Sequence, residues 1–140
     1  MLERRTLLAA TAVAALPAPI RAQGVWPERG VRVVVPWPPG GSTDVLARLL
    51  SDRLAHRFGQ PFVVENKPGA GGNIGADAVA KSRPDGATML LLDVTTLATN
   101  PALYPRPPFD ARRDLAPVTM LIYAPYILVA SNAGPVRDAG

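Results

Sequence analysis

The chain has 140 residues, no cysteine, and a formal net charge of +4 from 15 basic and 11 acidic residues. The lack of cysteine excludes disulfides, thiolate nucleophiles and cysteine metal sites. The basic residues form no run, so we expect no nucleic-acid partner. The part beyond residue 22 is long enough for about one domain with one hydrophobic core.

The first 22 residues are predicted to be a cleavable export signal. They contain a basic start, a short apolar run and a small-residue cleavage site, at residues 4–5, 7–16 and 20–22. The apolar run is too short for a stable membrane anchor. The two arginines loosely resemble a twin-arginine signal, although Glu3 stands where Ser or Thr is usual, so the ordinary Sec route remains open.

The first strand is predicted at residues 31–35, which are almost continuously apolar and β-branched, as in a parallel strand covered on both faces. Residues 36–41 hold three prolines, which stop the strand, and Gly40 and Gly41, which let a ligand approach the backbone. Ser42 or Thr43 is expected to cap the following helix. Free N–H groups at a helix N-terminus attract a carboxylate or phosphate, although a plain strand-to-helix turn fits this segment equally well.

The first helix is predicted at residues 43–58 and ends before Gly59 and Pro61. One face carries its large apolar side chains, Leu46, Leu49, Leu50, Leu54 and Phe58. Asp44, in the first turn, is expected to stabilise the helix dipole and to have a structural role. His56 is the single histidine of the chain and is expected at the surface, without a catalytic role.

A second strand, at residues 62–65, leads through a glycine-rich loop into a helix at residues 76–81. The loop has four glycines in seven residues, which is costly in conformational entropy unless the backbone geometry requires them. Two strand-to-helix loops separated by one helix would lie side by side at one edge of a parallel sheet. Open α/β sheets bind ligands at that edge.

The remaining elements are predicted as a strand, a short helix, a loop and two strands, at residues 88–92, 95–103, 104–109, 116–122 and 126–130. Asn100 and Asp110 are expected to fix loops through hydrogen bonds from side chain to backbone. The sequence therefore predicts an α/β fold with a mainly parallel sheet.

Four motifs, in this order and spacing, resemble the signatures of the Bug family, the TctC-like periplasmic solute receptors of tripartite tricarboxylate transporters. They are residues 36–44, 65–76, 84–86 and 100–104. The resemblance extends from residue 26 to residue 140 and implies a type II periplasmic-binding-protein-like fold, whose two lobes close on a small carboxylate. It also implies a periplasmic location, membrane transporter subunits as partners, no cofactor and no catalysis.

Receptors of this family are normally about twice the usual domain size of ~100–150 residues. The resemblance therefore implies that residues 23–125 form the first lobe, that residues 126–140 cross toward a second lobe, and that most of that lobe is missing. A fragment without function is one alternative.

The candidate ligand-binding residues come from three strand ends: Trp37, Gly40, Gly41, Ser42, Thr43, Ala70, Gly71, Gly72 and Thr95. Backbone N–H groups and bridging water would hold the carboxylate, because Lys67 is the one cationic side chain in the two glycine-bearing loops. Trp37 would either line the cleft or pack on the prolines, and the threonines at 95 and 96 would either complete the pocket or cap a helix. No catalytic or metal-binding residue is assigned.

A nucleotide-binding α/β enzyme domain is the alternative of a different class. Glycine-rich loops after buried strands also cradle phosphates, and Asp93 lies about 20 residues beyond Gly72, where a ribose-binding acid is found. Neither loop reads G-x-G-x-x-G in full, and Ser42, not lysine, follows Gly41. These departures favour the receptor.

Overall fold

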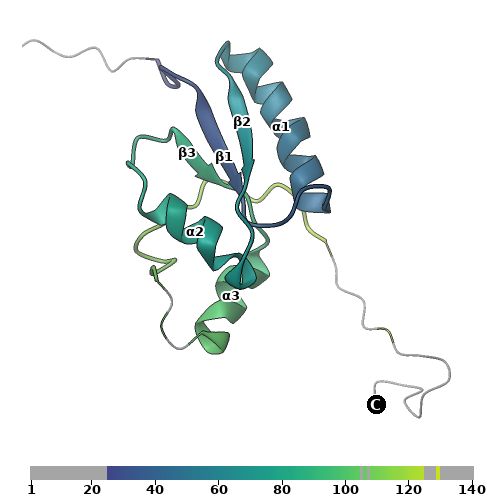
Figure 1. The fold of residues 1–140 in the computed structure, drawn as a ribbon. Helices are drawn as coiled ribbons and strands as arrows, with labels where there is room; N and C mark the ends of the chain where they lie inside the picture. Colours follow the sequence, from purple (N-terminus) through teal and green to yellow (C-terminus); the bar gives the residue numbers. More distant parts are fainter. Residues whose placement is uncertain (1–24, 105, 107, 125–128, 130–140) are drawn as a thin grey trace, which may run out of the picture.

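The computed structural model describes residues 25–104, 106, 108–124 and 129, so the predicted export signal lies outside the described residues. Strands and helices alternate along the chain (Figure 1). The elements are β1 (Val31–Val35), α1 (Ser42–Phe58), β2 (Phe62–Asn66), the 3₁₀ turn η1 (Ala70–Gly72), α2 (Asn73–Ala80), β3 (Thr88–Leu90) and α3 (Val94–Leu103).

The three strands form one parallel sheet in the order β2-β1-β3, as the sequence predicts. The chain moves outward from β1 to β2 and then crosses back over β1 to β3. Right-handed connections in these two directions place α1 and α2 on opposite faces of the sheet. The first helix packs on β1 and β2, and the second packs on β1 and β3.

The central strand, β1, is buried on both faces, which confirms the prediction. One face contributes to the main apolar cluster, formed by Val31, Val33, Val35, Ala47 and Phe62. Successive side chains of a strand point to opposite faces, so Val34 and Pro36 face the other side. Both are fully buried there, and Pro36 lies against Gly75 of α2.

The start of α1 differs from the prediction. The helix begins at Ser42, its N-cap residue is Gly41, and no side chain caps it, so the expected cap by Ser42 or Thr43 is wrong. Gly41 has an extended conformation and is the last residue before the helix, which therefore starts at Ser42, one residue earlier than predicted. The preceding turn is closed instead by the carboxylate of Asp44, which accepts a hydrogen bond from the N–H of Gly40.

The buried face of α1 also differs from the predicted leucine face. Asp44, Ala47 and Ser51 face the sheet, whereas Leu49 is 57% exposed and Phe58 is 41% exposed. Small side chains at 47 and 51 let the helix axis approach the sheet closely. The leucines at 46, 50 and 54 are consequently half-buried beside the contact.

The connection from β2 to α2 contains four consecutive residues with positive φ, which are Gly69 (127°), Ala70 (48°), Gly71 (61°) and Gly72 (91°). Glycine adopts this conformation without the steric cost that a side chain brings, which accounts for the glycines of the loop. The helix that follows begins at Asn73, three residues before the predicted start.

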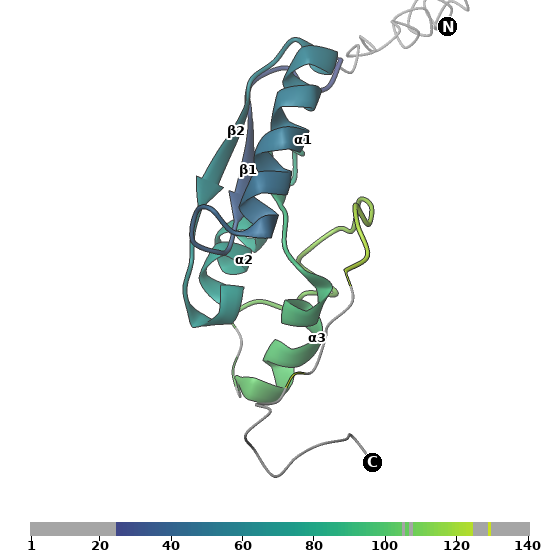
Figure 2. The ribbon, with the colours of Figure 1, turned by 90° about the vertical axis from the view of Figure 1, so that its right-hand side faces the viewer.

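The third strand is shorter and less buried than predicted. It ends at Leu90, and all three of its residues are half-buried. In the described part of the chain β3 pairs with β1 alone, so it is an edge strand with one free side. The helix α3 begins one residue before its predicted start and lies beyond the end of the sheet (Figures 1 and 2).

Residues 116–122 were expected to form a strand, and this prediction is wrong. Residues 116–124 have no regular structure, and Val118 and Met120 are 84% and 75% exposed. A strand is held by backbone hydrogen bonds to a neighbouring strand, and no described strand pairs with this segment. The last predicted strand, 126–130, lies outside the described residues except for Val129.

Two loop predictions concern residues 104–114. The described residues of 104–109 form no helix or strand, as predicted. Asp110 accepts a hydrogen bond from the N–H of Arg112 at 2.9 Å, which confirms its role in fixing that loop.

Candidate functional site

Three helix N-termini meet at one edge of the sheet. The last pair in the register between β1 and β2 joins Val35 to Asn66, and β3 pairs beside Val34. The loops before α1, η1 and α3 therefore leave the sheet at its carboxyl edge. This confirms the prediction that the loops at 39–43 and 69–73 share an edge, and such an edge is where open α/β sheets bind ligands.

A polar cluster under the first loop centres on Asp44, which is 3% exposed. Its carboxylate accepts hydrogen bonds from Arg48 at 3.0 Å through both Nε and Nη2, from the N–H of Gly40 at 3.0 Å, and from Nδ2 of Asn66 at 2.9 Å. The same Nδ2 donates to the carbonyl of Trp37 at 3.0 Å. The two ends of the 37–40 turn are thus tied to one cluster.

The cluster compensates the negative charge of Asp44. Hydrogen bonds from Arg48, Gly40 and Asn66, in order of effect, hold the pKa of the Asp44 carboxyl well below its usual range. The arginine lies in a bidentate pair, the geometry in which a guanidinium neutralises a carboxylate best. An acid at this helix N-terminus therefore has a structural role, as predicted, and its charge opposes an incoming anion less than a bare carboxylate would.

The first turn of α1 presents backbone N–H groups at the surface. Helix geometry leaves the N–H groups of the first turn without intrahelical acceptors. Gly41 and Ser42 are exposed and Thr43 is half-buried. A Cβ built on Gly41 would meet only the Pro38 carbonyl, at 3.9 Å, so the space above this backbone is open. The N–H of Gly40 differs from these three, because it already donates to Asp44.

The second loop is held from α3. Asn100 donates through Nδ2 to the carbonyl of Gly71 at 2.9 Å and to Oδ1 of Asn73 at 2.8 Å, which confirms its predicted role in fixing a loop. Gly72 is buried, and its N–H donates to the carbonyl of Gly69 at 3.0 Å. Ala70 and Gly71 remain exposed at the turn.

The third helix is capped by Asp93, whose Oδ1 accepts hydrogen bonds from the N–H and the hydroxyl of Thr96, each at 3.0 Å. Thr96 is thus part of a helix cap, and the side chain of Thr95 lies outside the described residues. The other oxygen of Asp93 accepts from Nε1 of Trp37 at 3.1 Å. Trp37 therefore links the first loop to the third, and it packs against the main apolar cluster.

These contacts weigh against the nucleotide alternative. Both carboxylate oxygens of Asp93 already accept hydrogen bonds within the chain, from Trp37 and Thr96, which gives this acid a structural role without a ribose. Lys67 pairs with Glu65 at 3.2 Å, so the carboxylate of Glu65 partly neutralises the charge of Lys67 at the sheet edge.

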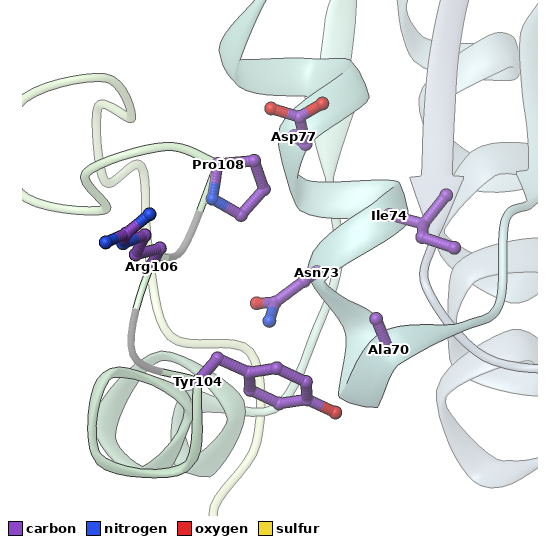
Figure 3. A pocket seen from close by; sticks show the side chains of 7 residues that line it. All are labelled: Ala70, Asn73, Ile74, Asp77, Tyr104, Arg106 and Pro108. Atoms are coloured by element: carbon purple, nitrogen blue, oxygen red, sulfur yellow. The ribbon is translucent and has the colours of Figure 1, made fainter.

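A separate hollow of about 210 Å³ lies between α2 and the chain after α3 (Figure 3). It is lined by Ala70, Asn73, Ile74, Asp77, Tyr104, Arg106 and Pro108. Its acid, Asp77, pairs with Lys81 at 2.8 Å. The hollow touches the second loop through Ala70 and Asn73 and does not include the open N–H groups of α1.

Other site types find no counterpart in the described residues. Within residues 25–104, 106, 108–124 and 129, no three His, Asp or Glu side chains gather as they would around a metal ion. None of the helices in that part of the chain is both long and apolar enough to cross a bilayer. The side chain of His56 is 81% exposed and lies 3.7 Å from Asp52, at the surface as predicted.

The sequence analysis missed two members of the polar cluster, Arg48 and Asn66. A signal for Asn66 was present, since it directly follows a predicted strand that neighbours β1 and therefore lies beside the turn after β1. Arg48 stands four residues after Asp44, the spacing at which side chains meet on a helix.

The comparisons with known proteins agree with this geometry. Residues 46–139 match the family described as "Tripartite tricarboxylate transporter family receptor". BugT of Bordetella pertussis is 46% identical over 121 residues, which are 86% of this chain and 37% of BugT.

Two solved structures resemble the described fold. The periplasmic binding protein BugD is 45% identical with a TM-score of 0.56, over 60% of this chain and 28% of that one. MatC of Rhodopseudomonas palustris, solved with bound malate, is 40% identical with a TM-score of 0.60, over 64% and 30% of the two chains. The chain thus spans under two fifths of these relatives, and it belongs to the TctC family of tripartite tricarboxylate transporter receptors.

Proposed function

We propose that this chain forms one wall of the ligand site of an extracytoplasmic receptor, which captures a small carboxylate for a tripartite tricarboxylate transporter. The observation that carries the proposal is the open N–H surface at the carboxyl edge of the sheet, formed by Gly41, Ser42 and Thr43. Family membership and the malate bound to MatC support a carboxylate as the ligand.

The contacts of the loops refine the set of ligand-binding residues. The amides of Gly41, Ser42, Thr43 and Gly71 are the proposed donors, because those of Gly40 and Gly72 already donate within the chain. Helix N-termini and backbone N–H groups neutralise an anion without a cationic side chain. Trp37 and Thr95 remain proposed neighbours of the ligand, and Ala70 and Gly72 shape the turn.

Binding and transport, not catalysis, are the proposed activity, with membrane transporter subunits as partners. The family name and the titles of the periplasmic relatives support this assignment. We place the mature protein in the periplasm, exported by residues 1–22 through the Sec or the twin-arginine route. Mass spectrometry of a periplasmic fraction should find a chain that begins at Gln23 or a neighbour, and an intact Met1 on a cytosolic protein would contradict this location.

Calorimetry with mono-, di- and tricarboxylates tests the ligand class. The chain joined to the second lobe of BugT should bind a carboxylate, and the chain alone should bind at least 100-fold more weakly, because losing half of the contacts costs about 3 kcal/mol or more. Gly41→Val should abolish binding by covering the open amides. Lys67→Ala is the matched control and should change little, because Lys67 pairs with Glu65. Binding of ATP or NAD without any carboxylate response would overturn the proposal.

A further inference from the structure

The turn that carries the open amides cannot hold its own shape through backbone hydrogen bonds. Its centre is Pro38 and Pro39, which have no N–H to donate. Gly40 has a φ of 89° and no atom within 4 Å of the place where a Cβ would stand, so no side-chain packing restrains it. Each proline fixes its own φ, but the remaining torsions of the turn depend on contacts from outside it.

Asn66 provides such a contact from a neighbouring strand. It is the last residue of β2 and pairs in register with Val35, so its side chain lies beside the start of the turn. Nδ2 donates to the Trp37 carbonyl at 3.0 Å and to Asp44 Oδ1 at 2.9 Å. Oδ1 accepts from Nη2 of Arg48 at 3.2 Å.

These bonds control the turn from both of its ends. Asn66 holds the first end directly, through the carbonyl of Trp37. It holds the second end through Asp44, whose Oδ2 accepts from the N–H of Gly40 while Oδ1 accepts from Asn66. The direction of the next amides, of Gly41 and Ser42, follows from this arrangement because they continue the same backbone into α1.

We infer that Asn66 is a positioning residue for carboxylate binding, which acts through Asp44 and Trp37 and does not itself touch the ligand. The inference rests on the proposed function of the amide surface. Without Asn66 the turn would sample several conformations, and the ligand would have to order it on binding. Because the two hydrogen bonds that hold the turn are lost, together with the bond from Arg48, we expect an association constant about 10-fold lower.

The first measurement needs no ligand and uses amide hydrogen exchange in the chain. Asn66→Ala should speed exchange of the Gly40 amide at least 10-fold, since the turn loses its anchor at the Trp37 carbonyl and Asp44 loses one of its two side-chain partners. Asn66→Asp should speed it further, because it replaces a donor with a second carboxylate beside Asp44. Ser82→Ala is the matched control, since it removes a single hydrogen bond to the Val79 carbonyl at the far end of α2. Unchanged exchange at Gly40 in Asn66→Ala would overturn the inference.

The second measurement follows the amide signals of Gly41 and Ser42 during a malate titration at constant ionic strength. When binding is weak, the initial slope of the amide chemical-shift change against malate concentration is proportional to the association constant. The ratio of two slopes therefore compares the association constants of two variants. The slope should fall about 10-fold in Asn66→Ala and stay at the wild-type value in Ser82→Ala, with both variants folded.

The outcomes separate the inference from the proposed function. A wild-type slope in Asn66→Ala, with wild-type binding intact, would overturn the positioning role alone. If the chain alone binds too weakly to respond, the same titration is made with the chain joined to the second lobe of BugT; no response of its amides to any carboxylate would overturn the proposed function, and the ligand-positioning role with it. Equal slope losses in both variants would assign the effect to general destabilisation and would also overturn the inference.

Discussion

Replacing Gly75 by alanine tests whether the two loops are packed as closely as the structure indicates. Gly75 lies in α2, where alanine is favoured over glycine by about 1 kcal/mol. A Cβ at this position would lie 2.8 Å from Cβ of Pro36, 3.0 Å from its Cα and 3.0 Å from the carbonyl oxygen of Lys67. Two of these three atoms belong to the backbone, so no rotamer change relieves the clash.

The steric cost should exceed the gain in helix propensity. Overpacking of a well-packed site costs about 1–3 kcal/mol, and contacts with backbone atoms favour the upper half of that range. Subtracting about 1 kcal/mol for propensity leaves a net loss of about 1–2 kcal/mol. For a domain of this size the melting temperature should fall by about 5–15 °C.

Thermal unfolding followed by circular dichroism measures this change. Gly41→Ala is the matched control, because its Cβ would meet only one atom, at 3.9 Å, and its φ is negative. Alanine is a weaker N-cap residue than glycine, so the control should lose about 0.5–1 kcal/mol, but it makes no clash and should lose less stability than Gly75→Ala. A Gly75→Ala variant as stable as the wild type, or more stable, would show that α2 does not press on the two loops.

Three further predictions concern the polar contacts of the site. The folded-state pKa of Asp44 lies below the unfolded value of about 3.9, so the ionised carboxylate stabilises the fold fully above about pH 4 and loses this effect as the pH falls toward the folded-state pKa. The urea midpoints of wild type and Asp44→Asn should therefore converge below pH 4, and a constant difference from pH 7 to pH 3 would contradict this. Asn100→Ala should cost about 1–3 kcal/mol in urea unfolding, because the Gly71 carbonyl loses its donor, and wild-type stability would refute the contact. Asp93→Ala should cost about 1–2 kcal/mol, because Thr96 loses its cap and Nε1 of Trp37 loses its acceptor, whereas Asp93→Asn should keep the cap through Oδ1 and lose less stability; equal losses in both variants would argue against the cap.

Much of the fold follows from local sequence patterns. Four valines among the five residues of Val31–Val35 predict a strand covered on both faces, and all four are buried as predicted. Apolar strands that alternate with helices predict a parallel sheet, and the connection rule then brings the glycine loops to one edge. These inferences succeed because β-branched residues, proline and glycine each act on the backbone conformation at their own position in the chain.

The contacts of individual side chains depended on neighbours far away in the sequence. Leu49 belongs to a leucine-rich face, yet Ala47 lies against the sheet, because the closest approach of helix and strand selects small side chains. Residues 116–122 have the composition of a strand, but no described strand pairs with them, although β3 has a free side. Periodicity describes which residues share a face and leaves open which face is covered.

The candidate site divides in the same way. The sequence by itself determined that glycine-bearing turns and helix N-termini follow two adjacent parallel strands, because strand, turn and helix are each encoded locally. Only the tertiary structure decided which amides stay open, since Gly40 donates to Asp44 and Gly72 donates to Gly69. It also brought Asn66 to the turn across the sheet, because hydrogen bonds between residues 22 and 29 positions apart depend on strand register and not on sequence spacing.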